Sequence, residues 1–405
     1  MAHDTDGPAH RARVRPLPVL GAVAALSVAA LAFLPWPFVW LAVLWSLFCF
    51  VVAWDSRRRF VRVVLINAGL VVLAVGGIET LFATLLTRRD RREAHYPPGY
   101  FQLDDDYGGA PTKNTSAHIQ KWHDSTLVYD VTYSFGPNGL RLSPPDRGSD
   151  AKACALFFSD SFMLGEGLND DQTLPWRVGV LTGGAVRVAN FGFHGFGAQQ
   201  MLVAFDHGRV AAATSCRVTN VVYLAIPDHV ARASGLAWFT RHSPRYDVIP
   251  DGHGGDSVLY HGHFDDAYRP GSSSAAVERQ LLKSWLYRWA SYLERPADDD
   301  DLRRYLAIVA ATERIARAQY PGCRFDVLWW GMHVGNPLDE VVLPALQKAG
   351  FHVHLVEDIL PEFKERPSSW LLSPYDAHPS ARADDLLARY LAREILAMPV
   401  PDTVR

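Results

Sequence analysis

The apolar residues of this chain are concentrated near its N-terminus. Between Arg15 and Asp55 there is no charged residue. This stretch is too long for one membrane-spanning helix, which needs about 20 residues. The Pro-Trp-Pro sequence at 35–37 predicts a tight turn that divides it into two helices. A third apolar stretch follows, interrupted only by Glu79. The pattern therefore predicts a membrane segment over residues 1–94 with three transmembrane helices, at about 17–34, 37–54 and 63–86.

The distribution of arginines predicts how this segment lies in the membrane, because cytoplasmic loops carry an excess of Lys and Arg. The Pro-Trp-Pro turn has no charge, whereas arginines flank the first two helices on the opposite side, at positions 11, 13, 15 and 57–59. We therefore expect a cytoplasmic N-terminus, a multi-pass protein of the cell membrane and an extracytoplasmic main domain. The arginines at 88, 89, 91 and 92 favour the reverse orientation.

A different pattern follows the membrane segment. Residues 95–150 are rich in Pro, Gly, Asp and Tyr and predict a lead-in segment that wraps the main domain. After it, short apolar runs without polar alternation stand at 155–158, 186–189, 221–226, 325–330 and 353–356. Helical patterns lie between or after them, at 173–181, 198–207, 302–317, 338–349 and 381–397. This alternation predicts an α/β domain over residues 151–400, with a doubly wound parallel five-stranded sheet.

The third and fourth predicted strands are too far apart for a simple crossover connection. We interpret residues 230–300, approximately, as an insertion that is able to cover the site. It contains a loop rich in Gly, His and Asp at 253–266 and one long predicted helix at 275–293.

Composition narrows the function. Charged residues make up 20% of the chain and its net charge is −3, which argues against a nucleic-acid partner. The four cysteines have no zinc-binding spacing. Cys154, Cys216 and Cys323 each precede a predicted strand, so they are either buried thiols or, in an oxidising compartment, a disulfide pair that the sequence does not identify.

Candidate catalytic residues follow the strands, at whose carboxyl ends ligands bind in such sheets. Ser161 follows the first strand and opens a helix, where the helix N-terminus stabilises developing negative charge. The second strand ends in a glycine-rich stretch, 190–197, that offers backbone N–H groups to an oxyanion. Near the C-terminus, Asp376 is placed to orient His378, the kind of base that a serine nucleophile requires.

In order and spacing these features resemble the SGNH/GDSL hydrolase superfamily, in its membrane-anchored bacterial form. The motif Ser159-Asp160-Ser161 is similar to the first family block, Asn190-Phe191-Gly192 to the second, and Asp376-Ala377-His378 to the last. The lead-in residues Tyr129-Asp130 and 136–141 also resemble membrane-bound members. The resemblance implies a flavodoxin-like three-layer fold, Ser161 as nucleophile, His378 as base and Asp376 as its orienting acid. It also implies that the N–H groups of Ser161 and Gly192 form the oxyanion hole, with Asp160 and Asn190 in support.

The third family block is absent. Its oxyanion asparagine should follow the third strand, where this chain has Pro227, Asp228 and His229. Proline has no donor and an ionised aspartate repels an oxyanion, so His229 is the expected replacement donor and Asp228 a supporting residue. Loss of one oxyanion donor costs about 100- to 1000-fold in rate.

These expectations lead to an esterase that hydrolyses an acyl ester of a cell-envelope glycan or lipid through an acyl-enzyme, with no metal or organic cofactor. Two alternatives stay open. One is an O-acyltransferase that moves the acyl group to an envelope polysaccharide and docks a membrane partner protein. The other is a catalytically degenerate domain that binds an envelope polymer or a partner protein. The acyl chain, the alcohol half and the oligomeric state are not determined by the sequence.

Overall fold

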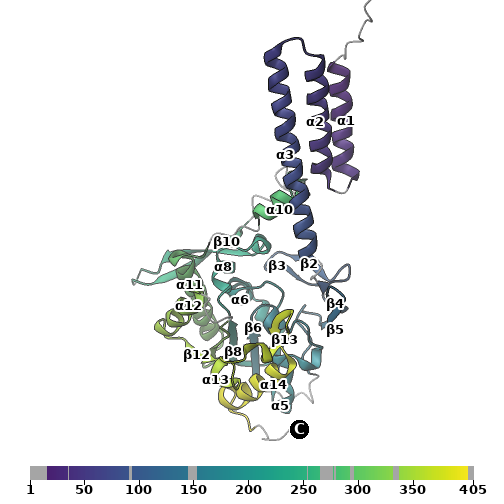
Figure 1. Ribbon diagram of the computed structural model, residues 1–405. Coiled ribbons are helices and arrows are strands. Elements are labelled where there is room, and N and C mark those ends of the chain that lie inside the picture. The colour runs from purple at the N-terminus through teal and green to yellow at the C-terminus, as the bar shows by residue number, and fades with distance from the viewer. Residues whose placement is uncertain are drawn as a thin grey trace, which may run out of the picture. The chain divides into compact units, whose positions relative to one another are not determined.

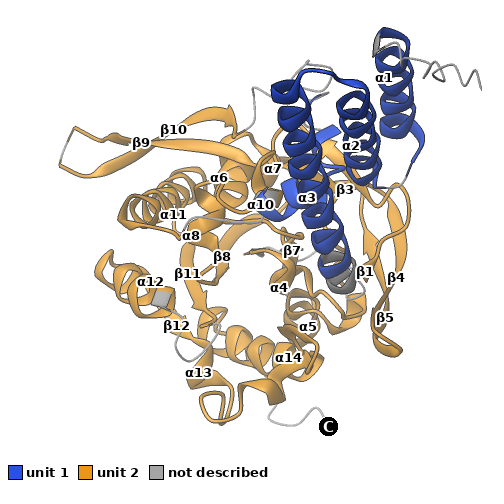
Figure 2. Cartoon of the chain, turned by 45° about the horizontal axis from the view of Figure 1, so that its top comes forward, with its two compact units in different colours: residues 1–90, 267–293 blue, residues 91–266, 294–405 orange. Residues whose placement is uncertain are grey.

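The structure is a computed structural model that describes residues 16–34, 36–90, 94–144, 153–252, 254–264, 277, 280–291, 296–331 and 337–399. The chain forms two compact units, residues 1–90 with 267–293, and residues 91–266 with 294–405 (Figure 2). The arginines at 11, 13, 15, 91 and 92, which entered the orientation argument, lie outside the described residues.

The first unit contains three N-terminal helices, α1 (Pro16–Phe33), α2 (Pro37–Asp55) and α3 (Arg59–Asp90). The predicted turn between the first two is present, with Trp36 in the left-handed conformation at φ 55° and Pro37 at the start of α2. The prediction of three membrane spans is only partly supported. Two described helical stretches, Pro37–Asp55 and Arg59–Leu85, are long and apolar enough to cross a membrane, whereas the apolar part of α1, Leu17–Phe33, is shorter than such a span.

Small residues allow α2 and α3 to pack closely. A Cβ added at Gly69 would lie 2.6 Å from the ring of Phe50, and one at Gly76 would lie 2.6 Å from the Ala42 Cβ. The Ser46 hydroxyl donates a hydrogen bond to the Gly69 carbonyl across this interface at 3.0 Å. Close approach through small residues and an interhelical hydrogen bond is typical of helix pairs in membranes.

The predicted insertion is built differently from the expectation. Its Gly/His/Asp-rich part forms a hairpin of β9 (Pro244–Pro250) and β10 (Asp256–His263) instead of a loop. The predicted long helix is interrupted at residues 282–284, and only α10 (Trp285–Ser291) is a described helix there. Residues 267–293, which include α10, belong to the first unit, whereas the hairpin of β9 and β10 belongs to the second (Figure 2).

Glu79 is the residue of α3 that attaches this segment within the first unit. Its carboxylate is buried and accepts hydrogen bonds from the Ser284 hydroxyl and from the backbone N–H groups of Trp285 and Leu286. The Lys283 ammonium donates to the Leu31 carbonyl near the end of α1. A buried carboxylate is costly without partners, and the start of α10 provides these.

The second unit contains the predicted α/β domain. Its five-stranded parallel sheet has the order β12 (His352–Leu355), β11 (Arg324–Trp329), β8 (Arg217–Ala225), β6 (Ala153–Phe158) and β7 (Val186–Asn190). The α/β class and the five parallel strands are thereby confirmed.

Helices cover both faces of this sheet (Figure 1). One hydrophobic core joins the sheet to α6 (Ala198–Asp206), α8 (His229–Ala233), α11 (Asp299–Gln319) and α12 (Pro337–Lys348). The other joins it to α5 (Leu174–Leu181), α13 (Val356–Ile359) and α14 (Ala381–Tyr390), which continues as a π-helical turn over Leu391–Ile395. The three layers match the expected architecture.

The lead-in segment has more strand than predicted. Strands β1 (Ala94–His95), β4 (Thr115–His123) and β5 (Thr126–Phe135) form an antiparallel sheet, and β2 (Phe101–Asp104) pairs with β3 (Gly108–Pro111). Arg141 forms backbone bridges with Phe135 and with Asn190. Through these bridges the lead-in is joined to the edge of the parallel sheet.

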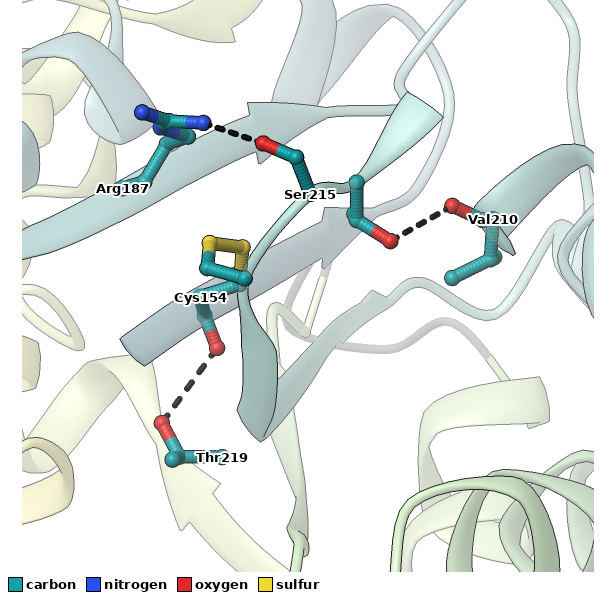
Figure 3. Close-up of a disulfide and its surroundings, with 7 residues drawn as sticks. Cys154, Arg187, Val210, Ser215 and Thr219 are labelled. Carbon is teal, nitrogen blue, oxygen red and sulfur yellow. Dashed lines mark hydrogen bonds between the residues drawn. A yellow bond between two sulfur atoms is a disulfide. The ribbon is translucent and has the colours of Figure 1, made fainter. Parts of the chain in front are cut away.

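The structure contains a disulfide between Cys154 and Cys216, a pair that the sequence left undetermined (Figure 3). β6 and β8 are parallel neighbours with Ala153 opposite Arg217, which brings the two cysteines to a Cα separation of 5.6 Å. That separation suits a disulfide. The Thr219 hydroxyl donates to the Cys154 carbonyl in the same region.

Removing this disulfide is expected to lower the free energy of unfolding by about 4 kcal/mol, because it closes a loop with a sequence separation of 62. The measurement is chemical unfolding of the full chain, comparing wild type with the double variant Cys154→Ser/Cys216→Ser. A reductant should destabilise the wild type and leave the double variant unchanged. Equal stability of the two chains under oxidising conditions would contradict the prediction.

Candidate active site

Ser161 lies where the sequence places it, immediately after β6 and at the start of the short helix α4 (Ser161–Leu164). Asp160 is the N-cap residue, and its Oδ1 accepts a hydrogen bond from the Phe162 N–H at 2.9 Å. No described residue accepts a hydrogen bond from the Ser161 N–H. That N–H is therefore available to a negatively charged oxygen at the helix N-terminus.

The three residues that resemble a catalytic triad are brought together, although Ser161 and His378 are 217 positions apart in the sequence. The His378 Nε2 lies 2.8 Å from the Ser161 Oγ, and its Nδ1 lies 2.6 Å from the Asp376 Oδ1. The same carboxylate oxygen accepts the backbone N–H of His378, which fixes the two residues on the short strand β14 (Asp376–Pro379). This is the nucleophile–base–acid geometry that activates serine.

Lys121, which sequence reasoning missed, completes the surroundings of Asp376. Its Nζ lies 2.6 Å from the second carboxylate oxygen, and the Asp376 side chain is almost wholly buried. Burial alone would raise the pKa of Asp376, but His378 and Lys121 outweigh it and lower that pKa. The carboxylate is thus held ionised beside the base.

The predicted oxyanion role of Gly192 does not fit the structure, and the contacts of Asn190 show why. The Asn190 Nδ2 donates to the Met163 carbonyl, which ties the end of β7 to α4. Its Oδ1 accepts the Gly192 N–H at 2.9 Å. A Cβ at Gly192 would lie 2.5 Å from the Leu164 nitrogen. Gly192 is therefore required for close packing, and its N–H is directed to Asn190 instead of to an oxyanion.

His229 is likewise wrong as an oxyanion donor. Its side chain is fully buried, with Nδ1 at 2.7 Å from the Tyr223 hydroxyl and Nε2 at 3.6 Å from the Asp160 Oδ2. Burial is the main cause that lowers the pKa of His229. The imidazole supports Asp160 from within the core, whereas Asp228 is exposed at the start of α8 and makes no side-chain cap hydrogen bond.

Arg232, in the connection after β8, is the residue of that connection that lies at the site. It lies on α8, and its guanidinium donates to the Asp160 Oδ2 and to the Phe196 carbonyl. Burial alone would raise the pKa of Asp160, but Arg232 and His229 hold it well below its usual range. The N-cap carboxylate beside Ser161 is therefore ionised and paired.

Glu166 is a second acid close to the base that the sequence did not indicate. Its Oε2 lies 3.4 Å from the His378 Nε2 and 3.0 Å from the His194 Nδ1. The Tyr129 hydroxyl donates to its Oε1 at 3.2 Å. Burial alone would raise the pKa of Glu166, but His378 and His194 lower it. The only local signal in the sequence is the motif Gly165-Glu166-Gly167, whose two glycines both adopt positive φ in the structure.

The charges around His378 shift its titration. Burial alone would lower the pKa of His378, but the carboxylates of Glu166, Asp376 and Asp160 together raise it to about 9. These groups therefore keep most of the imidazole protonated at neutral pH.

Arg141 holds the loop that presents Glu166. It is buried, and its guanidinium donates to the carbonyls of Leu164, Gly165 and Leu168 and to the Asp170 carboxylate. The stretch 136–141 that resembles the membrane-bound family members therefore positions the segment after the nucleophile. In the other lead-in motif, Tyr129-Asp130, the Tyr129 hydroxyl donates a hydrogen bond to Glu166, whereas the exposed Asp130 pairs with His118.

Ser161, Glu166 and His378 open into a cavity of about 860 Å³ within the second unit. Aromatic side chains form much of its wall, at Tyr96, Phe101, Tyr107, Phe193, Phe196 and Phe239, together with Lys121 and Arg232. Gly192 and His229 are not among the residues that line it. A large, mainly apolar cavity with a few convergent polar groups is typical of a small-molecule site.

Two groups of described residues have a geometry that can hold a metal ion. One is Glu166, Asp376 and His378. In that group Asp376 is already bonded to the Lys121 ammonium and the His378 Nε2 is already bonded to the Ser161 hydroxyl. The positive charge of Lys121 also repels a metal cation. The other group, Asp326, His352 and His354, lies outside the cavity lining.

No protein family and no curated protein matches the chain. Solved structures similar to it include one assigned to the G-D-S-L family of lipolytic proteins from Desulfitobacterium hafniense DCB-2, with 14% identity, a TM-score of 0.34, and coverage of 60% of this chain and 98% of that one. Another is the acetyl xylan esterase Est2A from the rumen bacterium Butyrivibrio proteoclasticus, with 9% identity, a TM-score of 0.32, and coverage of 63% and 66%. Similarity at this level identifies no function.

Proposed function

We propose that this protein is a membrane-anchored serine esterase of the SGNH/GDSL type, acting on an acyl ester. The observation that carries the proposal is the chain of contacts from Ser161 through His378 to Asp376, at the carboxyl edge of a parallel sheet and open to a large cavity. The aromatic wall of that cavity suits an acyl group or the apolar face of a sugar.

The contacts support a two-step reaction. His378 Nε2 accepts the Ser161 proton as Oγ attacks the ester carbonyl, and His378 then returns this proton to the departing alcohol. This leaves an acyl-enzyme. In the second step His378 takes a proton from a water molecule whose oxygen attacks the acyl carbonyl, and it then returns this proton to the departing Ser161 Oγ as the acid is released. Asp376 holds the imidazole and stabilises its cation in both steps.

The oxyanion of the tetrahedral intermediate needs donors other than Gly192 and His229, because the Gly192 N–H is bonded to Asn190 and the His229 side chain is buried in the core. We assign the free N–H of Ser161 as one donor. Arg232 lines the cavity and supplies positive charge from the connection after β8. A charged donor in a shielded site stabilises developing negative charge more strongly than a neutral one.

The proposed location is the outer face of a cell membrane, with envelope esters as substrates. The apolar helices α2 and α3 support attachment to a bilayer. The Cys154–Cys216 disulfide supports an oxidising compartment for the second unit, because disulfides are rare in the cytosol. A membrane-bound enzyme on that side meets O-acylated glycans and lipids.

The direct test is labelling of the detergent-solubilised full chain with a fluorophosphonate probe, in which Ser161 Oγ displaces fluoride and forms a bond to phosphorus. Wild type should be labelled, Ser161→Ala should not, and the exposed Ser369→Ala should be labelled like wild type. No labelling of a folded wild type would favour a degenerate binding domain instead. Labelling that persists in Ser161→Ala would remove Ser161 as the nucleophile.

Acyl transfer uses the same acyl-enzyme, with a sugar hydroxyl in place of water. The large cavity leaves room for such an acceptor, and a membrane partner protein would then supply the acyl donor. Product analysis with a soluble acyl ester, in the presence and absence of a sugar acceptor, separates the two reactions. An acylated sugar as the main product would assign transfer, and free acid alone would assign hydrolysis.

A further inference from the structure

A second cluster of chemically active side chains lies on the sheet away from Ser161. Asp326 is on β11, and His352 and His354 are on the neighbouring strand β12, with Asp326 opposite His352 in the register. Residues two apart on a strand face the same side, so both imidazoles point to the carboxylate. In the register Asp326 lies opposite Val222 of β8, and Val222 lies opposite Phe157 of β6, so the cluster is separated from Ser161 across the sheet, at its β12 edge.

We propose that Asp326, His352 and His354 form a zinc site. The Asp326 Oδ1 lies 2.7 Å from the His352 Nδ1 and 3.1 Å from the His354 Nε2. One ligand atom from each residue lies within 4.8 Å of the other two. Imidazole nitrogen and carboxylate oxygen are zinc ligands, and three of them leave the fourth tetrahedral position to water.

Asp326 provides the independent observation that points to a cation. Its side chain is 1% exposed, and its buried Oδ2 has no hydrogen-bond donor among the described residues. A buried carboxylate oxygen without a partner costs free energy. A metal ion bound at this carboxylate would offset the cost of burying that oxygen.

Tyr390 supplies the outer contact that such sites require. Its hydroxyl lies 2.8 Å from the His354 Nδ1. When the tyrosine oxygen accepts a hydrogen bond from the Nδ1–H of His354, Nε2 carries its lone pair toward Asp326, and this is the tautomer that binds a metal. Contacts of this kind fix the ring of a ligating histidine, and their loss costs about 10- to 100-fold in metal affinity.

The positive charge of Arg324 disfavours a metal cation at Asp326. Its guanidinium donates to the Asp326 Oδ1 at 3.0 Å, but its side chain is 48% exposed and is able to turn into solvent. The site therefore contains a built-in competitor. Removing this cation should strengthen zinc binding, a result that a simple network of ion pairs does not predict.

The proposed role is structural. β12 is the edge strand of the sheet, and an ion held by β11 and β12 joins it to its only strand neighbour in that sheet. Because the ligands are assembled only in the folded chain, zinc should stabilise the fold. This inference does not depend on the proposed esterase activity.

The experiment uses the detergent-solubilised full chain, stripped of metal with EDTA and titrated with Zn²⁺ by calorimetry and with Co²⁺ by visible absorption. We expect one ion per wild-type chain and a rise in Tm of about 5 °C with zinc. Affinity should fall at least tenfold in His352→Ala, His354→Ala and Asp326→Asn, and about tenfold in Tyr390→Phe. It should rise in Arg324→Ala. The control is His118→Ala, which changes an exposed histidine that pairs with a single aspartate and should bind zinc like wild type.

Circular dichroism establishes that each variant is folded, and the exposed His352 is the substitution least able to disturb folding. Failure of wild type to bind zinc, or affinities unchanged in both His352→Ala and His354→Ala, would overturn the site. So would weaker binding in Arg324→Ala.

Discussion

Replacing the proposed base, His378→Ala, is expected to lower kcat/KM for a soluble acyl ester by about 10⁴-fold or more. Serine is a weak nucleophile at neutral pH, and the only ring nitrogen within hydrogen-bonding distance of the Ser161 Oγ among the described residues is the His378 Nε2. Asp376→Asn should cost about 10⁴-fold, because an amide no longer fixes the imidazole in the required tautomer. Steady-state kinetics on the full chain measures both.

Residues that act as a unit do not lose activity additively. The double variant His378→Ala/Asp376→Asn should therefore be about as slow as His378→Ala alone. The exposed His118 gives the matched control, and His118→Ala should retain wild-type kinetics. If Asp376→Asn kept activity within about tenfold of wild type, the contact between Asp376 and His378 would be structural, and the triad assignment would be wrong.

The parts of the fold that the sequence predicted are those with a strong local pattern. Strands buried on both faces have no polar alternation, and all five predicted runs lie in strands of the parallel sheet. The hairpin of β9 and β10 was missed because its glycines and histidines resemble a loop. In the structure Val258 and Tyr260 pack on the core while Leu259 between them is exposed, an alternation that three consecutive apolar residues do not reveal in the sequence.

The site could be predicted only as far as its residues belong to ordered motifs. Ser161 follows the first strand of the parallel sheet, Asp376 and His378 precede the last helix, and the structure brings the three residues into contact. The oxyanion prediction failed for reasons of position. Asn190, two residues earlier, takes the Gly192 N–H in a local turn, and the helix α8 turns His229 into the core. Neither outcome is visible without the backbone path.

Glu166 and Lys121 were missed because nothing in the linear sequence connects them to the base. Lys121 comes from the antiparallel sheet of the lead-in, and Glu166 comes from a loop held by a buried arginine. Such groups reach a site through tertiary packing alone. They are nevertheless the residues expected to control its pH dependence.

Glu166→Gln is expected to move the pH profile of kcat/KM toward acid. In wild type the pKa of His378 is raised to about 9, so only about one base in a hundred is neutral at pH 7. Wild-type activity should therefore rise about tenfold per pH unit from pH 6 to 8 and level off near pH 9. The carboxylates that raise the pKa of His378 are Glu166, Asp376 and Asp160, and the coulombic interaction with Glu166 is the largest single cause of that rise.

The glutamine keeps the shape of the side chain and removes its charge. The apparent pKa should fall by at least about one unit, and activity at pH 7 should rise severalfold. The same charge stabilises the imidazolium that forms during attack, so the plateau at high pH should be lower in the variant than in wild type. The two profiles are thus expected to cross, which a merely structural defect does not produce.

The matched control is Glu394→Gln, which removes an exposed glutamate from the end of the chain's last described helical turn. Its profile should superimpose on that of wild type. If Glu166→Gln kept the wild-type apparent pKa and lost activity equally at every pH, Glu166 would only support the loop that carries it. A crossing of the profiles would instead show that the enzyme holds its base protonated at neutral pH through a carboxylate outside the triad.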